Sequence, residues 1–266
     1  NMMSVIASSF AVLFLFWTIT GIARRLVDFE KDDVYTQILV LVAGLVGALG
    51  FAYTDSFWYN AVEAEVYAMA TCILSILFWL GLRWEADMDK PRGDRWLVLI
   101  AFVIGLSFGV HFMGLLTIPA IGMLYYFKTA ETVTPKGFII ANVCSVAVLL
   151  FIFKLLLPST LAYFGNAEVF FVNEIGLPFH SGTIAAGLSL VLFFVYTLRL
   201  THRKAWVQLN TALLCVLFIL IGFSSWLMLP IRANANTVIN ENAPADARAL
   251  LAYYNLEQYP ETHLFY

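Results

Sequence analysis

The stretch TQILVLVAGLVGALGFAY, residues 36–53, holds no charged residue and is apolar almost throughout. A helix needs roughly 20 such residues to cross about 30 Å of hydrocarbon. The whole chain shares this character, because 61% of its 266 residues are hydrophobic and only 12% are charged. Runs such as 146–157 also lack the alternation of apolar and polar residues that a transmembrane β-barrel requires. We therefore expect an all-α, polytopic transmembrane helix bundle.

Apolar segments on both sides of this stretch extend the bundle to about eight spans. The block 96–127 is longer than one span needs, and a cluster of Gly109, His111 and Gly114 interrupts it. We therefore expect two short helices that meet near His111. The expected spans are 2–23, 36–53, 60–84, the two halves of 96–127, 137–157, 183–198 and 207–229.

Basic residues are distributed unevenly across this layout. Twelve of the 15 fall on one side, namely Arg24, Arg25, Lys31, Arg83, Lys90, Arg92, Arg95, Lys128, Lys136, Arg199, Arg203 and Lys204. Loops rich in Lys and Arg stay in the cytoplasm, so this side is predicted to be cytoplasmic. Only Lys154, Arg232 and Arg248 remain for the outer side. The bias also supports the span count, since one missed helix would invert every later loop.

The layout predicts two regions, a transmembrane bundle over 1–229 and an extracytoplasmic loop and helix segment over 230–266. Within the second region, ADARALLAYYN at 245–255 has the pattern of an amphipathic helix, preceded by an Asn-rich structured loop. The chain opens with Asn1 and enters an apolar run at once, without the basic leader of a signal peptide. We expect an upstream part that this sequence lacks, and a truncation at the other end as well.

Four polar segments sort to the predicted outer face: 54–68, the turn around His111, 167–182 and 229–244. The three cysteines lie in apolar runs without paired spacing, so neither a disulfide framework nor a zinc site is indicated. The net charge of −3 and the absence of a basic stripe argue against nucleic acid as a partner. The expected partner of the chain as a whole is the lipid bilayer.

The first of these segments carries three carboxylates, on Asp55, Glu63 and Glu65. If it forms the first turns of the third span, Glu63 shares one stripe with Asn60, and Glu65 lies nearly opposite with Trp58. The two glutamates would then not act as a side-by-side pair. We expect Glu65 to reach the functional site, Glu63 to be the alternative and Asp55 to cap the turn. A helix start that is simply solvated is the competing interpretation.

Two further residues qualify as site candidates. His111 is predicted near the carboxylates, where it would bind a divalent cation or transfer a proton, although a lone histidine is more often structural. Arg232 departs from the charge bias, and an outward arginine beside an Asn-rich loop suits bidentate binding of a phosphate. Snorkelling to lipid headgroups is the alternative for Arg232. Asp55, Trp58, Asn60 and Asn234 complete the candidate substrate contacts.

Three motifs carry a resemblance to a known family. SFWYNAVEAEVYAM at 56–69, GLSFGVHFMGLLTIPAI at 105–121 and LPIRANANTVINENAPADARALLAYYNLEQY at 229–259 together resemble a bacterial multi-pass membrane family of unknown function. That family is related to a vertebrate protein O-mannosyltransferase and is similar to the C-type glycosyltransferases.

The resemblance implies a bacterial inner-membrane enzyme whose functional face is outward. It would take a sugar from a polyprenyl-phosphate carrier and transfer it to a protein or envelope-glycan acceptor. Outward carboxylates would bind a metal or deprotonate the acceptor, and a basic residue would offset the charge of the departing phosphate. In that group the principal catalytic acid lies in the first external loop, which we expect upstream of Asn1, so this fragment alone would lack it.

Two other classes of function stay open at this stage. A transporter or lipid flippase would carry polar residues near mid-membrane in several helices and related halves. Here the span centres are almost free of ionisable groups, and no internal repeat is visible. A non-catalytic subunit of an envelope complex is the third hypothesis.

Overall fold

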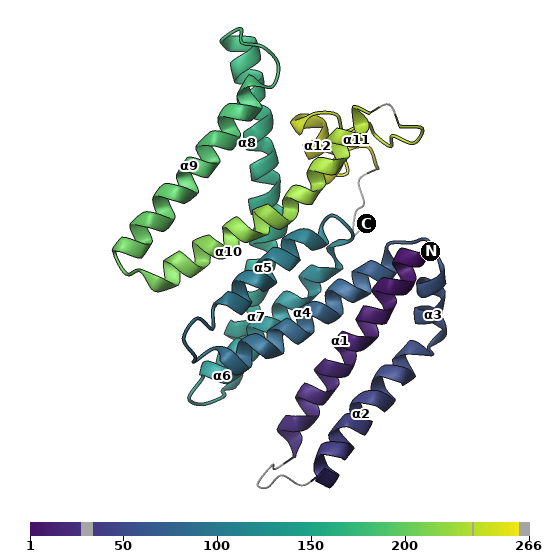
Figure 1. Ribbon diagram of the computed structural model, residues 1–266. Coiled ribbons are helices and arrows are strands. Elements are labelled where there is room, and N and C mark those ends of the chain that lie inside the picture. Colours follow the sequence, from purple (N-terminus) through teal and green to yellow (C-terminus); the bar gives the residue numbers. More distant parts are fainter. Residues whose placement is uncertain (28–33, 236, 261–266) are drawn as a thin grey trace. The chain divides into compact units, whose positions relative to one another are not determined.

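The computed structural model describes residues 1–27, 34–235 and 237–260 of the chain. Helices make up nearly all of the described part, which contains no strand, and this confirms the all-α prediction (Figure 1). The α-helices are α1 Met2–Leu26, α2 Val34–Ala52, α3 Asp55–Val62, α4 Tyr67–Asp87, α5 Arg95–Ser107, α6 Thr117–Thr129, α7 Pro135–Leu150, α8 Leu157–Val169, α9 Ser181–Arg203, α10 Val207–Phe223, α11 Met228–Ala233 and α12 Ala247–Tyr254. Two 3-10 helices, η1 Phe112–Leu116 and η4 Ser224–Leu227, and two π-helices, η2 Phe151–Leu156 and η3 Phe170–Glu174, join some of them.

Within the described part, six helical stretches are long and apolar enough to cross a bilayer: Met2–Leu26, Val34–Ala52, Tyr67–Asp87, Pro135–Glu174, Ser181–Arg203 and Val207–Ala233. The two short helices α5 and α6 occupy the places of the expected fourth and fifth spans, and each has 13 residues. The chain is thus a polytopic helix bundle. Lys31, which contributes to the predicted charge bias, lies outside the described residues.

The chain divides into two compact units, each described by itself. Unit 1 comprises Asn1–Val146 with Phe218–Phe223, and unit 2 comprises Ala147–Leu217 with Ser224–Tyr266. This division differs from the expected boundary after residue 229, which concerns the border of the membrane and stays a prediction.

Small side chains allow α1 and α4 of unit 1 to pack closely. The buried positions Ser4, Ala7, Ser8 and Ala11 recur at helical spacing and form one face of α1. In a membrane, small residues of this kind allow backbones to approach and van der Waals contacts to form. Ala7 and Ala11 pack in one buried cluster with Phe57, Ala68 and Cys72. This cluster joins the first halves of α1 and α4 to α3.

The expected third span over 60–84 is wrong at its start. Residues 63–66 are not helical, and they separate the short helix α3 from α4. Phe57 of α3 is buried in the cluster with Ala7 and Ala68, so α3 lies against the bundle as a separate element. The two stripes that were expected to hold Glu63 and Glu65 therefore do not exist.

The predicted interruption at His111 is confirmed. The helix α5 ends at Ser107, and His111 donates its backbone N–H to the Ser107 carbonyl over 2.7 Å before η1 begins. A Cβ on Gly114 would lie 2.7 Å from Ser107 Oγ, so the returning chain passes too close for any larger residue. Ser107 and Thr117 are fully buried, and their hydroxyls donate to the carbonyls of Ile104 and Gly114.

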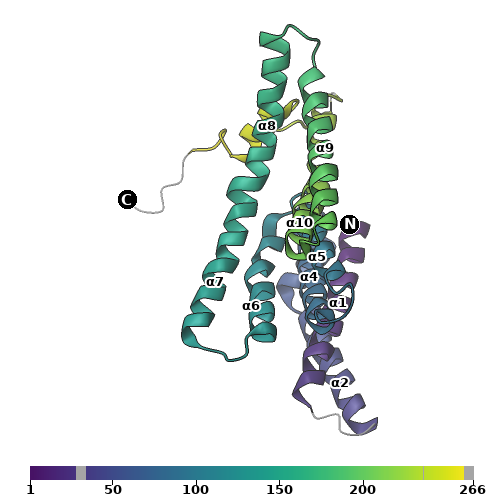
Figure 2. The same cartoon turned by 90° about the vertical axis from the view of Figure 1, so that its left-hand side faces the viewer.

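The helical stretch in the place of the expected sixth span, 137–157, is much longer than that span. It continues from Pro135 to Glu174, 40 residues, through the π-helical turns η2 and η3. At about 1.5 Å per residue it is roughly 60 Å long, twice the thickness of the hydrocarbon layer. In unit 2, α8 and α9 form a hairpin (Figure 2). Glu168 closes it by accepting bonds from His180 N at 2.5 Å and Thr183 N at 2.7 Å.

The C-terminal segment of unit 2 follows the predicted order of loop and helix. The helix α12 begins after Asp246, whose side chain accepts from the backbone N–H groups of Arg248 and Ala249. Its amphipathic character is confirmed, because Leu250 is buried on one face. The preceding helical stretch extends to Ala233, so Arg232 lies in its last turn and not three residues beyond the span as expected.

Candidate functional site

The carboxylate-bearing segment and the His111 turn meet at one end of unit 1, named here the acidic end (Asn1, 54–68 and 109–113). Asn1 at the start of α1 donates its side-chain amide to the Val62 carbonyl over 2.6 Å. The rings of Tyr67 and His111 lie 5.9 Å apart. Two of the four polar segments expected on one face are thus neighbours.

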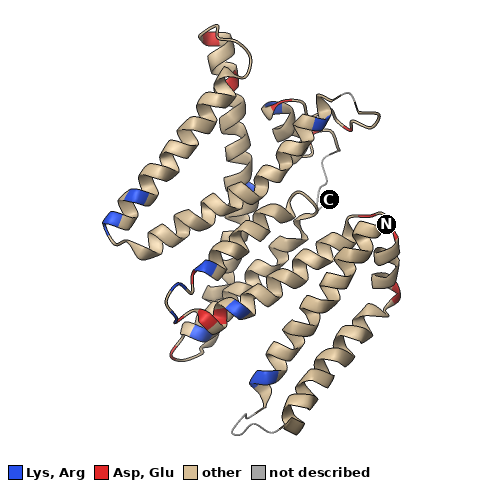
Figure 3. Ribbon diagram, in the orientation of Figure 1, with Lys and Arg blue, Asp and Glu red and all other residues tan. Residues whose placement is uncertain are grey.

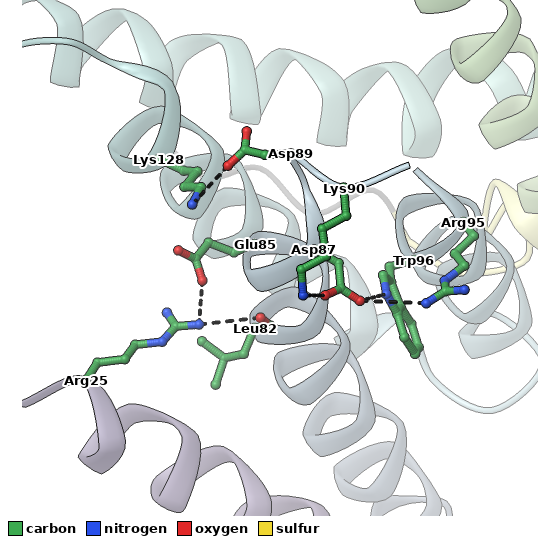
Figure 4. A network of polar contacts seen from close by, with 9 residues as sticks. All are labelled: Arg25, Leu82, Glu85, Asp87, Asp89, Lys90, Arg95, Trp96 and Lys128. Atoms are coloured by element: carbon green, nitrogen blue, oxygen red, sulfur yellow. Dashed lines mark hydrogen bonds and ion pairs between the residues drawn. The ribbon is translucent and has the colours of Figure 1, made fainter. Parts of the chain in front are cut away.

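The opposite end of unit 1 carries paired charges and is named the charged end (Figure 4). Arg25 at the end of α1 pairs with Glu85 of α4. Asp87 accepts from Lys90 and from Trp96 Nε1, both at 2.8 Å, and lies 3.7 Å from Arg95. A further pair, Lys128 with Asp89 at 3.1 Å, brings in the end of α6.

The two ends are separated by about the thickness of a bilayer. The helix α4 has 21 residues and runs from Tyr67 at the acidic end to Asp87 at the charged end. At 1.5 Å per residue it spans about 30 Å, which matches the hydrocarbon layer. Because α1 also begins at the acidic end and finishes with Arg25, α1 and α4 cross in parallel.

The carboxylates differ between these ends in their partners. All four ion pairs among the described residues lie at the charged end. None of them involves Asp55, Glu63 or Glu65, and all three of these side chains are exposed. The acidic end therefore presents carboxylates to solvent, where they are accessible to a ligand.

The local geometry around these carboxylates corrects two expectations. Glu63 is the residue that ends α3, with extended backbone at φ −82° and ψ 153°. Glu65 follows in the same non-helical stretch, so the helical argument that Glu63 and Glu65 lie on opposite stripes is wrong. Glu65 as the site residue, with Glu63 as the alternative, stays a prediction. Thr54, not Asp55, occupies the N-cap position of α3. Asp55 lies in the first turn, where its negative charge is attracted to the positive end of the helix dipole.

Trp58 and Asn60, two of the expected substrate contacts at the acidic end, differ in how exposed they are. Trp58 is exposed and stacks on Tyr53, with ring centroids 6.0 Å apart and planes 13° apart. Asn60 is half-buried in α3. The exposed pair of rings is a flat apolar surface of the type on which a sugar ring or an acyl chain can pack.

His111 holds the turn in which it lies. Its Nδ1 accepts the backbone N–H of Met113 over 3.2 Å, and its ring stacks on Phe112 with centroids 4.7 Å apart. An Nδ1 that accepts this bond leaves Nε2 as the other polar atom of the ring. The expected role of His111 in binding a cation or transferring a proton stays a prediction.

Arg232 and Asn234 belong to unit 2. Arg232 is exposed in the last turn of α11. Asn234 ends that helix, and its amide nitrogen donates to the carbonyls of Pro230 at 2.8 Å and Ala245 at 2.9 Å. Asn234 therefore ties the loop to α11, the helix that carries Arg232.

The C-terminal helix α12 is fastened to α8 at one point and to the π-helix η2 at another. Arg248 packs against Gly165 of α8, where a Cβ would lie 3.0 Å from Arg248 Cγ. The Tyr254 hydroxyl donates to the carbonyl of Phe153 in η2 over 2.5 Å. Burial raises the pKa of Tyr254, so its hydroxyl stays protonated as a donor.

The expected meeting of all four polar segments stays a prediction. The segments 54–68 and 109–113 meet within unit 1, whereas 167–182 and 229–244 belong to unit 2. In unit 2 the helix α12 contacts η2 at Phe153, α8 at Gly165 and η4 at Trp226. Residue 236 of the last segment lies outside the described residues.

Nothing in the described part gathers three or more His, Cys, Asp or Glu side chains in a metal-binding arrangement. The expected divalent cation therefore stays a prediction that rests on the exposed carboxylates of the acidic end.

Sequence reasoning missed Tyr67, Asp87 and Tyr254. Tyr67 lies 5.9 Å from His111 between ring centroids, a contact that the sequence pattern does not indicate. Asp87 could be recognised from its position in EADMDKPRGDR at 85–95, where acids and bases lie close together. The Tyr254 hydroxyl bonds to a carbonyl 101 residues away, and no local pattern reveals this contact.

Together these features define a class, a polytopic α-helical membrane protein whose unit 1 has one end with ion-paired charges and one end with exposed carboxylates. Comparison with known proteins refines it. Residues 1–134, half of the chain, match the family described as the Protein O-mannosyl-transferase TMEM260 N-terminal domain. The chain belongs to this family and is a glycosyltransferase-like membrane protein. No curated protein and no solved structure matches it.

Proposed function

We propose that this protein transfers a sugar from a polyprenyl-phosphate carrier to a protein or envelope-glycan acceptor at the outer face of a bacterial cytoplasmic membrane. The observation that carries the proposal is the acidic end of unit 1. Its carboxylates are exposed, outside the ion pairs of the described residues, and part of the 1–134 region that matches the mannosyltransferase family.

The charge distribution supports an outward acidic end. Arg25, Lys90, Arg95 and Lys128 lie at the charged end of unit 1. Because basic residues are retained in the cytoplasm during insertion, the charged end is assigned to the cytoplasm. The acidic end, about 30 Å away along α4, is then on the outer face.

Transfer of the sugar to a hydroxyl group requires a base that takes the hydroxyl proton of the acceptor. An acceptor hydroxyl oxygen bonds to the sugar C1 while the bond from C1 to the carrier phosphate oxygen breaks, and the phosphate leaves with the electron pair. The hydroxyl proton passes to a carboxylate, which we assign to Glu65 with Glu63 as the alternative. A divalent cation held by the same carboxylates would supply charge stabilisation when bound.

The donor side asks for a positive charge. Arg232 is exposed on α11, and α11 is held by the two bonds of Asn234. A guanidinium can bond two phosphate oxygens at once, and we assign the guanidinium of Arg232 to the carrier phosphate. The role of Arg232 rests on unit 2 alone, and the role of Glu63 and Glu65 rests on unit 1 alone.

Single substitutions in the full-length protein test these roles. The assay follows labelled mannose from undecaprenyl-phosphate mannose to protein or glycan. Glu65→Gln or Glu63→Gln is expected to lower kcat by about 10²-fold or more, because a lost general base costs that amount. Glu131→Gln is the matched control, since Glu131 is an exposed glutamate of the loop after α6. Wild-type transfer by both acidic-end variants would remove the proposed base.

The donor role is tested separately. Arg232→Gln is expected to raise KM for the carrier about 10-fold or more, with Arg232→Lys intermediate, because lysine keeps the charge but loses the planar fork. An unchanged KM in both variants would assign Arg232 to lipid headgroups.

The transporter and scaffold hypotheses are outcomes of the same assay. A flippase would move the labelled carrier across vesicles without forming a glycosylated product. A scaffold would neither move nor consume it.

A further inference from the structure

The turn between α9 and α10 in unit 2 must lie at a membrane surface. Both helices belong to candidate spans, Ser181–Arg203 and Val207–Ala233, and only residues 204–206 connect them. A connection this short leaves no room for the chain to depart from the interface. Trp206 of this turn is exposed, as is typical of side chains that anchor helices at the headgroup level.

An open groove lies beside this turn. It has a volume of about 410 Å³ and is lined by Leu198, Arg199, His202, Arg203, Asn210 and Leu214. Asn210 of α10 donates its amide to Leu198 O at 3.2 Å and to Thr201 Oγ1 at 2.8 Å. These bonds fix the first turns of α10 against the last turns of α9, so the two walls of the groove are held together.

The basic residues of the groove share one face of α9. Arg199 and Arg203 are four residues apart and His202 lies between them, so the spacings i, i+3 and i+4 bring all three together. Two like charges at i and i+4 repel each other by a few tenths of a kcal/mol. An anion between them would replace that repulsion with attraction.

No acid of the described chain pairs with these arginines. The four ion pairs all lie in unit 1. Within unit 2, Glu168 bonds to Thr183 at the start of α9 and Glu174 ends η3, so both lie at the end of the α8–α9 hairpin away from the groove. Red bands mark that end of the hairpin in Figure 3, and blue bands mark the end of α9 near the groove. The 23 residues of α9 separate the two ends by about 33 Å, far beyond a Debye length of about 8 Å. Lys204 lies over the Trp206 ring at 4.9 Å, which leaves Arg199 and Arg203 as the cations that line the groove.

We propose that this groove binds the phosphate of an anionic phospholipid headgroup in the leaflet next to the α9–α10 turn. The two guanidinium groups match phosphate oxygens, and Leu198 and Leu214 offer apolar contact to the glycerol and acyl region. Basic pockets between membrane helices bind anionic headgroups in this way. The site is additional to the proposed sugar-transfer site and does not depend on it.

The test compares lipid binding by purified wild-type protein and two double variants. The readout is the binding of phosphatidylglycerol, with phosphatidylcholine as the neutral lipid, measured by native mass spectrometry in detergent. Arg199→Gln/Arg203→Gln is expected to weaken phosphatidylglycerol binding by about 10-fold or more, because each arginine attracts the anionic headgroup and the variant lacks both. Arg199→Lys/Arg203→Lys keeps both charges and is expected to lose less.

Arg24→Gln/Lys136→Gln is the matched control, since both residues are exposed and basic and lie outside the groove. It removes the same charge and is expected to change binding less than twofold. An equal loss in the control and the groove variant would overturn the proposal, as would wild-type binding by the groove variant. The melting temperatures of all variants show that each is folded.

Two competing ligands complete the experiment. Inorganic phosphate is expected to displace phosphatidylglycerol poorly, because it lacks the apolar part. Displacement by inorganic phosphate at low millimolar concentration would assign the groove to a free anion and overturn the lipid assignment. Selective retention of undecaprenyl phosphate over phosphatidylglycerol would overturn it as well.

Discussion

Close contact between two helices of unit 1 predicts a large effect from a very small substitution, Gly105→Ala. Gly105 of α5 lies against residue Ile219. A Cβ at Gly105 would lie 2.8 Å from the Ile219 carbonyl carbon and 3.0 Å from its Cα, and nearer still to its carbonyl oxygen. These atoms belong to the backbone and cannot rotate away, so α5 must move.

The magnitude follows from that overlap. Carbon atoms make favourable contact at about 3.5–4.0 Å, so the backbones must separate by roughly 0.7 Å or more. Overpacking of this kind costs about 1–3 kcal/mol. Gly222 makes the reciprocal approach, since a Cβ there would lie 2.5 Å from Leu106 N. The two backbones therefore lie close together at both glycines.

The matched control is the same substitution at Gly50, which has no atom within 4 Å of its Cβ position. There only the helix propensity of alanine acts, a gain of up to about 1 kcal/mol. Unfolding of purified protein in detergent is expected to show Gly105→Ala less stable than Gly50→Ala by about 1–3 kcal/mol. Equal stability of the two variants, within about 0.5 kcal/mol, would refute the close approach of α5 to Ile219.

Three further predictions concern single interactions. Tyr254→Phe is expected to destabilise unit 2 by about 1–2 kcal/mol, because the hydrogen bond from Tyr254 to the Phe153 carbonyl is lost. Amide hydrogen exchange in α12 should then rise, and unchanged exchange would contradict the role of this bond. Burial raises the pKa of Tyr254. Above about pH 10 the unfolded chain therefore loses a proton that the folded chain keeps, and the folded state becomes less stable as pH rises. The melting temperature of wild type should fall with alkali more than that of Tyr254→Phe, and an equal fall in both would contradict this. Asp87→Asn is expected to lower the melting temperature more than Glu131→Gln, because Lys90, Arg95 and Trp96 all contact this carboxylate; an equal change in both would show that the charged end does not depend on Asp87.

The sequence was most informative where hydropathy and glycine determine the chain path. The span between Val34 and Ala52 and the interruption at His111 follow from uninterrupted apolar character and from glycines that permit a tight return. Arg25 and Lys128 lie with their acidic partners at one end of unit 1, as the predicted charge bias requires.

The break at 63–66 could not be predicted from local pattern. The stretch AVEAEVYA at 61–68 is rich in helix formers and contains neither Gly nor Pro. What separates α3 from α4 is tertiary: Phe57 is buried against Ala7 and Ala11, and Asn1 bonds to Val62, 61 residues away. Contacts of this range override propensity, and they also changed the expected relation of Glu63 to Glu65.

The long helix through Pro158 was missed for a related reason. Proline usually interrupts a helix, but here the helical stretch continues through Pro158, and the turn before it is a π-helix. The Tyr254 hydroxyl bonds to the Phe153 carbonyl in that turn. Arg232 and Asn234 stay candidate site residues, and the bond from Asn234 to Ala245 could not be predicted because only the fold brings these residues together.

The central claim is that the carboxylates of the acidic end promote sugar transfer on the outer face. Its most direct test measures mannosyl transfer from undecaprenyl-phosphate mannose in right-side-out vesicles that contain the full-length protein, with a product-trapping reagent that cannot cross the membrane. We predict outward product formation by wild type and Glu131→Gln, and loss of about 10²-fold or more in Glu63→Gln/Glu65→Gln. Transfer by the double variant at the wild-type rate, or product only in inside-out vesicles, would contradict the claim.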